Sequence, residues 1–334
     1  MLRYFCVIFV MIHHLQTNSQ LSAKIYEPFF LNGFIFLSGY TYTHREGYRN
    51  FVLNKARQLL IPCFFFGLLI IITGNIFTPA EHEGILKDLL WFFLQIREKN
   101  DAMWFAAAMF TGYLCFYWLI ERYLKMQDGK DNDGKLILLL FALYLLEIFY
   151  EYYFPNDLFP WHNNRLPWHL EYLPTMMFFM FSGYLYRHKY EKPEKKPYLL
   201  LVISGVLFYF YVFSDLDDLL QVSIPGNILF RLIGEMLGLP FFICLSKVLK
   251  PNRIMMYIGQ NSLIYFGIAH YINVPLQLLF ARYFHDYYLH VLEIKIYRLR
   301  FSLVFAVISS LIIMIPVYII NTYFPFIMGR KPNR

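Results

Sequence analysis

The sequence predicts an all-α membrane protein, a polytopic bundle of about ten transmembrane helices with both chain termini in the cytoplasm. Of its 334 residues, 58% are hydrophobic and only 16% are charged, a composition that ordinary soluble domains do not have. Apolar stretches of helical length recur along the whole chain. The net charge of +7 is concentrated in alternate linkers, as the positive-inside rule describes. These observations exclude a soluble enzyme, and no nucleic-acid partner is expected.

Ten apolar segments are long enough to be membrane helices. They cover residues 2–17, 28–43, 59–77, 102–120, 136–154, 169–186, 198–213, 226–246, 257–280 and 302–321. The linkers on one side of the predicted bundle, with the C-terminal tail, hold 19 lysines and arginines, against 9 on the other side. This asymmetry places both termini in the cytoplasm. The two longest outer linkers, 78–101 and 281–301, are predicted to contain helices that lie in the membrane interface.

The first segment, LRYFCVIFVMIHHL, carries an arginine and two histidines in an apolar helix. Arg3 and His14 are eleven positions apart, which is about 20° past three full turns, so they share one face, about 16 Å apart along the axis. His13 lies about 100° round the helix from His14. Ionisable residues in such a helix predict a functional site. The simpler alternative is that Arg3 reaches the lipid headgroups and the histidines cap a short helix.

A second group of polar residues lies at the predicted cytoplasmic ends of the helices. This group comprises Ser38, Gly39, Tyr40, Arg45, Arg49, Lys55 and Arg57. Arginine and lysine side chains there suit a phosphorylated ligand, although the positive-inside rule alone also explains such charge. Arg57 precedes the third segment in KARQLLIP, where Pro62 is predicted to open the helix and the guanidinium to face inward.

Other polar residues lie deeper or nearer the outer side: Glu147, His169, Glu171, Arg231, Glu235 and His270. Arg231 and Glu235 are four residues apart, so they are expected to pair. His270 is about 20 Å into its helix, close to the predicted depth of His14. Aromatic residues surround Glu171 and the outer linker WHNNRLPWH. These residues, Tyr152, Tyr153, Trp161, Trp168 and Tyr172, fit either an interfacial belt or a sugar-binding surface.

One sequence pattern occurs twice, as FIFLSGYTYTHREGY at 34–48 and FFMFSGYLYRHKY at 178–190. Both copies are predicted to lie at cytoplasmic helix ends. The similarity indicates either an internal repeat or small residues that let helices pack closely, followed by positive-inside charge.

Six stretches of the chain together carry a family resemblance. They are LRYFCVIFVMIHH, FIFLSGYTY, KARQLLIP, MWFAAAMF, YLPTMMFFMFSGYLY and IGQNSLIYFGIAH. In this order they resemble the motifs of the membrane acyltransferase-3 family, integral-membrane O-acyltransferases that act on bacterial surface glycans. The arginine, ten intervening residues and histidine of the first stretch are similar to the family signature. The resemblance extends over nearly the whole chain.

The resemblance implies a ten-helix fold, a cytoplasmic acyl-CoA donor, with acetyl-CoA the first choice, and transfer to a glycan hydroxyl. Arg3 and His14 match the arginine and histidine pair, Ser38, Gly39 and Tyr40 match the second-helix element, and Arg57 matches the arginine of the basic segment. Many members carry another arginine three positions earlier, where this chain has Asn54 followed by Lys55. The subgroup with an additional extracytoplasmic domain does not fit, so residues 1–334 are expected to form a single transmembrane domain.

The function expected from these features is O-acyl transfer to a cell-surface polysaccharide or its lipid-linked precursor. Arg3 and His14 are the predicted catalytic residues; Arg3, Ser38, Tyr40, Lys55 and Arg57 would bind the donor; Glu147, His169, Glu171 and His270 would bind the acceptor. His14 would act as a general base, or would itself carry the acyl group. No metal is expected.

The alternative is a glycan flippase, polymerase or exporter of the cell envelope. Short outer linkers and a cytoplasmic cationic cluster argue against that alternative. The expected location is the bacterial inner membrane, and the expected partners are the lipid bilayer, the saccharide acceptor and other proteins of envelope polysaccharide assembly.

Overall fold

The computed structural model describes most of the chain as helix. The described residues are 1–15, 17, 20–44, 47–78, 83–96, 103–126, 132–155, 159–161, 163–191, 197–214 and 224–330. Helices account for 86% of the structure, and the described residues contain no strand. The all-α prediction is therefore confirmed.

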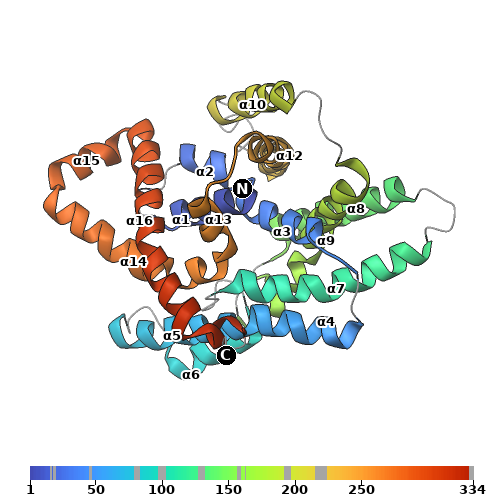
Figure 1. Ribbon diagram of the computed structural model, residues 1–334, viewed down its shortest axis with the longest axis horizontal. Helices are drawn as coiled ribbons and strands as arrows, with labels where there is room; N and C mark the ends of the chain where they lie inside the picture. The colour runs from blue at the N-terminus through green and yellow to red at the C-terminus, as the bar shows by residue number, and fades with distance from the viewer. Residues whose placement is uncertain are drawn as a thin grey trace. The chain divides into compact units, whose positions relative to one another are not determined.

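The helices follow the apolar segments of the sequence (Figure 1). In chain order they are α1 Leu2–His13, α2 Gln20–Tyr26, α3 Phe30–Tyr40, α4 Tyr48–Lys55, η1 Ala56–Leu60, α5 Ile61–Phe77, α6 Ile85–Leu94, α7 Trp104–Met126, α8 Asp133–Tyr153, η4 Pro167–Tyr172, α9 Leu173–Leu185, η5 Tyr186–Tyr190, α10 Pro197–Phe213, α12 Ile224–Val248, α13 Arg253–Gln260, α14 Ser262–Tyr283, α15 His285–Glu293, α16 Lys295–Tyr323 and η6 Pro325–Met328. Each of the ten predicted segments contains a helix, and α6 and α15 occupy the two long outer linkers.

Five helical stretches among the described residues are long and apolar enough to cross a membrane. They are Tyr48–Phe77, Asp133–Tyr153, Ile228–Val248, Ser262–Tyr283 and Lys295–Tyr323. Helices α1 and α10 are apolar but shorter. A spanning helix needs about 20 residues, so these five stretches support a membrane protein.

The chain divides into two compact units. The first unit consists of Met1–Phe34 and Lys192–Tyr318, and the second of Ile35–Glu191 and Ile319–Arg334. In the first unit, α1 packs against α2, α12, α13 and α14, and α10 packs against α12. Eight of the twelve residues of α1 are buried, as expected for a helix that is apolar on nearly every side.

The two copies of the repeated pattern pack against each other in the second unit. A Cβ atom added at Gly39 would overlap the carbonyl oxygen of Met180, and one added at Gly183 would overlap the carbonyl oxygen of Phe36. Each serine-glycine-tyrosine element therefore places its glycine against the backbone of the other helix. Such close approach needs glycine because any side chain would hold the helices apart. The structure supports close packing as the reason for the repeated pattern.

Pro62 lies in the first turn of α5, as predicted, but the helical backbone does not begin there. One continuous helical stretch runs from Tyr48 to Phe77, and its middle, η1, is a π-helical turn that ends two residues before Pro62. Proline cannot donate a backbone hydrogen bond to the preceding turn, and its ring crowds the carbonyl group there. A wide turn just before the proline accommodates both effects without ending the helix. The side chain of Arg57, on this turn, is exposed rather than turned inward.

The glycine contact gives a prediction for stability. Gly183→Ala should lower the free energy of unfolding by about 1–3 kcal/mol, the usual cost of overpacking, because the added methyl group meets backbone rather than a movable side chain. The matched control is Gly134→Ala in α8, where an added Cβ meets nothing within 4 Å. That variant should be neutral or more stable, since alanine is the better helix former. Thermal unfolding in detergent measures the stability of both variants. Equal unfolding midpoints for Gly183→Ala and Gly134→Ala would contradict the close contact between Gly183 and the backbone of Phe36.

Candidate functional site

The first unit brings the predicted catalytic residues into one helix-packing arrangement. Helix α1 ends at His13, and His14 caps it with its backbone N–H 3.3 Å from the carbonyl oxygen of Val10. At the other end of α1, Gly259 of α13 packs against Arg3, and a Cβ atom added at this glycine would lie 3.5 Å from Arg3 Cβ. A glycine at this point lets α13 approach the backbone of α1 closely.

His14 and His270 are neighbours in the first unit. His14 interacts electrostatically with His270 of α14 and with His13. Helix α14 follows α13 directly, and both pack against α1, so the helix pair that includes Gly259 also supplies His270. Both imidazole side chains are exposed and can be reached by a substrate. The similar depth predicted for the two histidines from the sequence is consistent with this arrangement.

His13 faces a different set of residues. Its Nδ1 atom lies 3.3 Å from the hydroxyl oxygen of Tyr26 and 3.9 Å from Glu27 Oε1. Its ring also packs against the ring of Phe30, with the centroids 5.6 Å apart. These contacts come from α2 and the start of α3, which agrees with the rotation of about 100° between adjacent helical residues. The side chains of the two adjacent histidines therefore have different partners.

Asn273 is a site candidate that the sequence motifs did not reveal. It is 0% exposed, and neither atom of its amide group has a hydrogen-bond partner among the described residues. It lies three positions after His270 in α14, which places the two side chains near each other along the helix. The signal was present in the sequence, because an amide inside an apolar helix is costly and marks a candidate site.

The predicted donor residues of the second unit include two with partners inside the protein. The Tyr40 hydroxyl donates a 2.7 Å hydrogen bond to Glu191 Oε2, and Arg187 donates to the Tyr40 carbonyl oxygen at 2.9 Å. The Nζ atom of Lys55 lies 3.9 Å from the ring centroid of Tyr113, a cation–π contact. Ser38, beside Gly39, is partly exposed.

Arg57 is the most accessible of the predicted donor ligands. Its side chain is exposed on the π-helical turn η1, and such turns are frequent at functional sites. Its backbone is held by Gly329, because a Cβ atom there would overlap the Arg57 carbonyl oxygen. Gly329 has a φ of 63°, a conformation that glycine adopts without strain. Arg49 is also exposed, and Arg45 lies outside the described residues.

A second π-helical turn, η5, carries the basic side chains Arg187, His188 and Lys189. Lys189 forms an ion pair with Asp133, and the Tyr123 hydroxyl donates a 2.6 Å hydrogen bond to the same carboxylate. The hydrogen bond to Asp133 raises the pKa of Lys189 above its usual value. Lys189 is thus committed to a contact within the protein.

Glu147, a predicted acceptor ligand, contacts the N-terminal turn of α9. Its Oε2 atom accepts hydrogen bonds from the backbone N–H and the hydroxyl group of Thr175, both at 2.7 Å. The Glu147 side chain is only 7% exposed. A carboxylate in this position satisfies a free N–H group and interacts favourably with the helix dipole. The contact gives Glu147 a structural role, and acceptor binding by Glu147 stays a prediction.

The outer linker of the second unit contains a strained turn. Trp168 and His169 have φ angles of 57° and 55°, in the left-handed region that costs non-glycine residues free energy. The Thr111 hydroxyl donates to the Trp168 carbonyl oxygen at 3.1 Å, and Glu171 accepts a 2.9 Å hydrogen bond from the N–H of Leu166. His169 is 0% exposed and Glu171 is buried. Backbone strain of this kind accumulates at ligand sites.

The aromatic residues of the same linker also contact one another. The Trp161 ring stacks on Phe159 with centroids 4.9 Å apart, and its Nε1 atom donates to the Arg165 carbonyl oxygen at 2.8 Å. Tyr152 and Tyr153 are exposed. These contacts fit an interfacial belt and a sugar-binding surface equally well.

The predicted pair of Arg231 and Glu235 is confirmed. Arg231 Nε lies 3.1 Å from Glu235 Oε1 within α12, and Glu235 is 4% exposed. A buried carboxylate needs such a partner to offset the loss of hydration.

Comparison with known proteins identifies the family. A family model described as an acyltransferase domain matches residues 1–325 of the 334-residue chain. The chain belongs to the acyltransferase-3 family. No curated protein and no solved structure matches it. The protein is therefore a membrane acyltransferase, and the resemblance found in the sequence motifs is confirmed.

In a membrane acyltransferase, the exposed imidazole of His14 is one side chain whose chemistry suits acyl transfer. A neutral imidazole can accept the proton of an attacking hydroxyl group, or it can attack the acyl donor itself. The neighbouring imidazole of His270 can orient or assist it. In the second unit, the exposed guanidinium of Arg57 can bind a phosphate group.

The contact between Glu147 and Thr175 gives a test of the role of Glu147 in the acyltransferase. Glu147→Ala should lower the free energy of unfolding by about 1–3 kcal/mol, because it leaves buried donors unsatisfied. Thr175→Val should cost less, since it removes only the hydroxyl donor and leaves the N–H bond in place. Thermal unfolding of the two variants measures the difference. A normal unfolding midpoint for Glu147→Ala together with a raised KM for the acceptor would instead favour direct substrate binding.

Proposed function

We propose that this acyltransferase is an integral-membrane O-acyltransferase that uses cytoplasmic acyl-CoA, acetyl-CoA first, and acylates a cell-surface polysaccharide or its lipid-linked precursor. The observation that carries the proposal is that His14 is exposed at the end of α1 and interacts electrostatically with His270. Arg3 lies at the opposite end of the same helix and packs against Gly259. In this proposal, Arg3 is the cation that binds the donor, and His14 is the base that acts on the acceptor.

The proposed topology has ten membrane spans with both termini in the cytoplasm, in the inner membrane of a bacterium. It is supported by the 19 to 9 division of lysine and arginine between the two sets of linkers, as the positive-inside rule requires. Short helices such as α1, with twelve residues, span only about 18 Å. We propose that such helices lie within a single transmembrane domain formed by longer neighbours.

Donor binding is proposed for Arg3, Ser38, Tyr40, Lys55 and Arg57. Guanidinium groups form strong paired hydrogen bonds with phosphate, which assigns Arg3 and Arg57 to the phosphate groups of CoA. Arg3 belongs to the first unit and Arg57 to the second, so each is tested by its own variant. The cation–π contact of Lys55 with Tyr113 limits Lys55 to a supporting role.

The proposed reaction uses His14 as a general base. Its neutral imidazole accepts the proton of the acceptor hydroxyl while that oxygen attacks the thioester carbonyl carbon. The tetrahedral intermediate collapses, the carbon–sulfur bond breaks, and the ester product remains. The CoA thiolate then takes the proton from the imidazolium of His14, which restores the base. The acyl-carrier alternative would place a covalent acyl group on His14 before the acceptor arrives.

Acceptor binding is proposed for Glu147, His169, Glu171 and His270. Among these, His270 has the strongest support because it is exposed and lies near His14. The strained turn at Trp168 and His169 supports a ligand site in the outer linker. The saccharide acceptor and other proteins of envelope polysaccharide assembly are the proposed partners.

The catalytic assignment predicts different kinetic defects for His14 and Arg3. His14→Ala should lower kcat by about 10²–10⁴, the usual contribution of a general base, with little change in the KM of acetyl-CoA. Arg3→Ala should mainly raise that KM, by about tenfold or more, because a charge-assisted contact is lost. Transfer of radiolabelled acetyl groups to a glycan fraction measures both in membranes with equal protein abundance.

The controls for this experiment are His290→Ala and Arg300→Ala, exposed residues of α15 and α16 that have no proposed role. Glycan acetylation by His14→Ala at the rate of His290→Ala would refute the catalytic assignment. Absence of labelled glycan with the unaltered protein, with either acetyl- or succinyl-CoA, would favour glycan transport over acyl transfer.

A truncated donor tests whether the arginines bind phosphate. Acetyl-pantetheine carries the same thioester as acetyl-CoA but has no phosphate groups. Arg3→Ala and Arg57→Ala should therefore reduce kcat/KM for acetyl-CoA and leave the value for acetyl-pantetheine nearly unchanged. Steady-state rates with the two donors give the comparison. Equal losses with both donors would mean that the arginines support the fold rather than the phosphates.

A further inference from the structure

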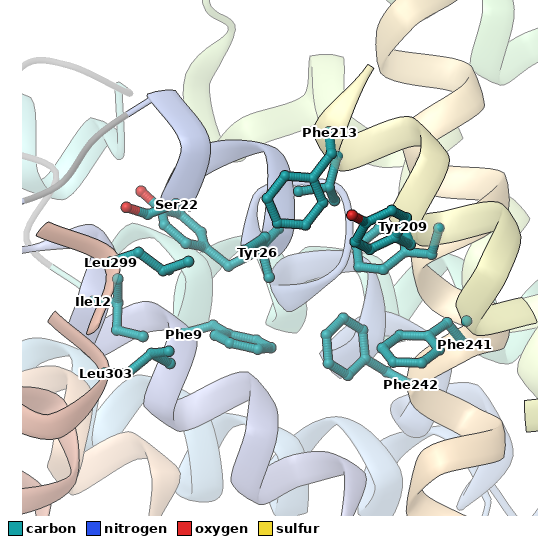
Figure 2. Close-up of a pocket in the computed structure, with 14 residues that line it drawn as sticks. Phe9, Ile12, Ser22, Tyr26, Tyr209, Phe213, Phe241, Phe242, Leu299 and Leu303 are labelled. Carbon is teal, nitrogen blue, oxygen red and sulfur yellow. The ribbon is translucent and has the colours of Figure 1, made fainter. Parts of the chain in front are cut away.

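The first unit contains an apolar pocket of about 360 Å³ beside α1 (Figure 2). Its walls come from α1, α2, α10, α12 and α16. Figure 2 shows Leu299 and Leu303 at one end of the pocket and Tyr209 and Phe241 at the other. The volume lies within the usual range for small-molecule sites, about 300–1,000 Å³.

The lining of the pocket is suited to a hydrocarbon. Aromatic rings from α10 and α12 form one wall of the pocket. The ring of Phe208 stacks on the ring of Phe241, with centroids 5.2 Å apart, and lies edge-on to the ring of Phe242, with centroids 5.8 Å apart. Hydroxyl groups enter the lining only from Ser22, Tyr26 and Tyr209 among the residues that form it. No charged side chain is among these lining residues. A polar ligand would find few hydrogen-bond partners there to replace its hydration, whereas each buried methylene gains about 0.8 kcal/mol.

One wall of the pocket is connected to the histidine pair. Tyr26 lines the pocket, and its hydroxyl oxygen lies 3.3 Å from His13 Nδ1. His13 is followed directly by His14, and the two rings are 5.2 Å apart. A chain in contact with Tyr26 would therefore lie one side chain away from His13, which is next to the proposed catalytic base.

We propose that this pocket holds the hydrocarbon chain of a lipid-linked saccharide, which is then the acceptor form that the acyltransferase uses. The inference rests on the proposed function, since it assigns one part of the acceptor to one part of the protein. At about 30 Å³ for a group the size of a water molecule, the pocket holds on the order of a dozen such groups. The pocket therefore has room for one chain segment, and its apolar lining favours that chain over the saccharide.

Photolabelling tests the occupant without any acyl donor. The acyltransferase is placed in phospholipid nanodiscs with a dodecyl glycoside that carries a diazirine in its chain, and the labelled peptides are mapped by mass spectrometry. A phosphatidylcholine with the same diazirine, at the same mole fraction, is the second probe. The glycoside should label peptides of α10 and α12, and the phospholipid should label them at least tenfold less. Equal labelling by both probes would identify the occupant as bulk lipid and overturn the proposal.

Two filling variants and their matched controls locate the labelled site. Gly205→Leu enters the pocket from α10 and Leu303→Trp from α16, whereas Val206 and Val304 are exposed neighbours outside the lining. A filling side chain that removes two methylene contacts between the glycoside chain and the pocket should weaken binding of the glycoside about tenfold. Labelling should fall by about that factor in both filling variants and remain unchanged in Val206→Leu and Val304→Trp. Unchanged labelling in either filling variant that retains its unfolding midpoint would refute the pocket as the site.

The two proposals fail separately. Glycan acetylation without chain labelling in the pocket would refute only the acceptor assignment. Chain labelling without acyl transfer by the unaltered protein would refute only the proposed reaction.

Discussion

The arrangement of the candidate site depends on close backbone contact between helices at glycine residues. In a membrane, lipid tails are as apolar as leucine side chains, so helices associate through shape rather than through hydrophobic burial alone. Gly259 lets α13 meet α1 at Arg3, and α13 leads directly into α14, which carries His270. The distance between His270 and His14 is therefore set partly by a contact at the other end of α1. In the second unit, Gly39 and Gly183 fix the crossing of α3 and α9 in the same way.

The sequence was sufficient for those features that helical periodicity determines. Arg3 and His13 lie within one short helix and His14 follows it directly, and the spacing correctly predicted that the two adjacent histidines have different partners. That Arg3 and His14 share one face stays a prediction. The pair of Arg231 and Glu235 followed from spacing as well. The family motifs predicted the reaction class, because the same residue types recur in the same order along the chain, and the family match over residues 1–325 agrees with them.

The features that the sequence did not predict depend on contacts between distant segments. The continuation of the helix through Pro62 requires the π-helical turn η1, and a proline after a polar linker normally indicates a helix start. The left-handed conformation of Trp168 and His169 is imposed by neighbouring helices and has no local sequence signal. Glu147 was classed as a candidate ligand because buried carboxylates are costly, whereas its contact with Thr175 is a tertiary one. A buried charge shows that a partner must exist, but it does not show whether that partner is protein or substrate.

His13 and His14, the two adjacent histidines at the end of α1, have different surroundings. His14 interacts electrostatically with His270 of α14, whereas His13 lies within hydrogen-bonding distance of Tyr26 at the edge of an apolar pocket. Because the two side chains have different partners, we do not expect either histidine to replace the other. In the proposed site, the end of α1 lies between a polar side and an apolar side. An acceptor with a hydrocarbon chain and a saccharide head has the same division, and a free sugar would leave the apolar side unused.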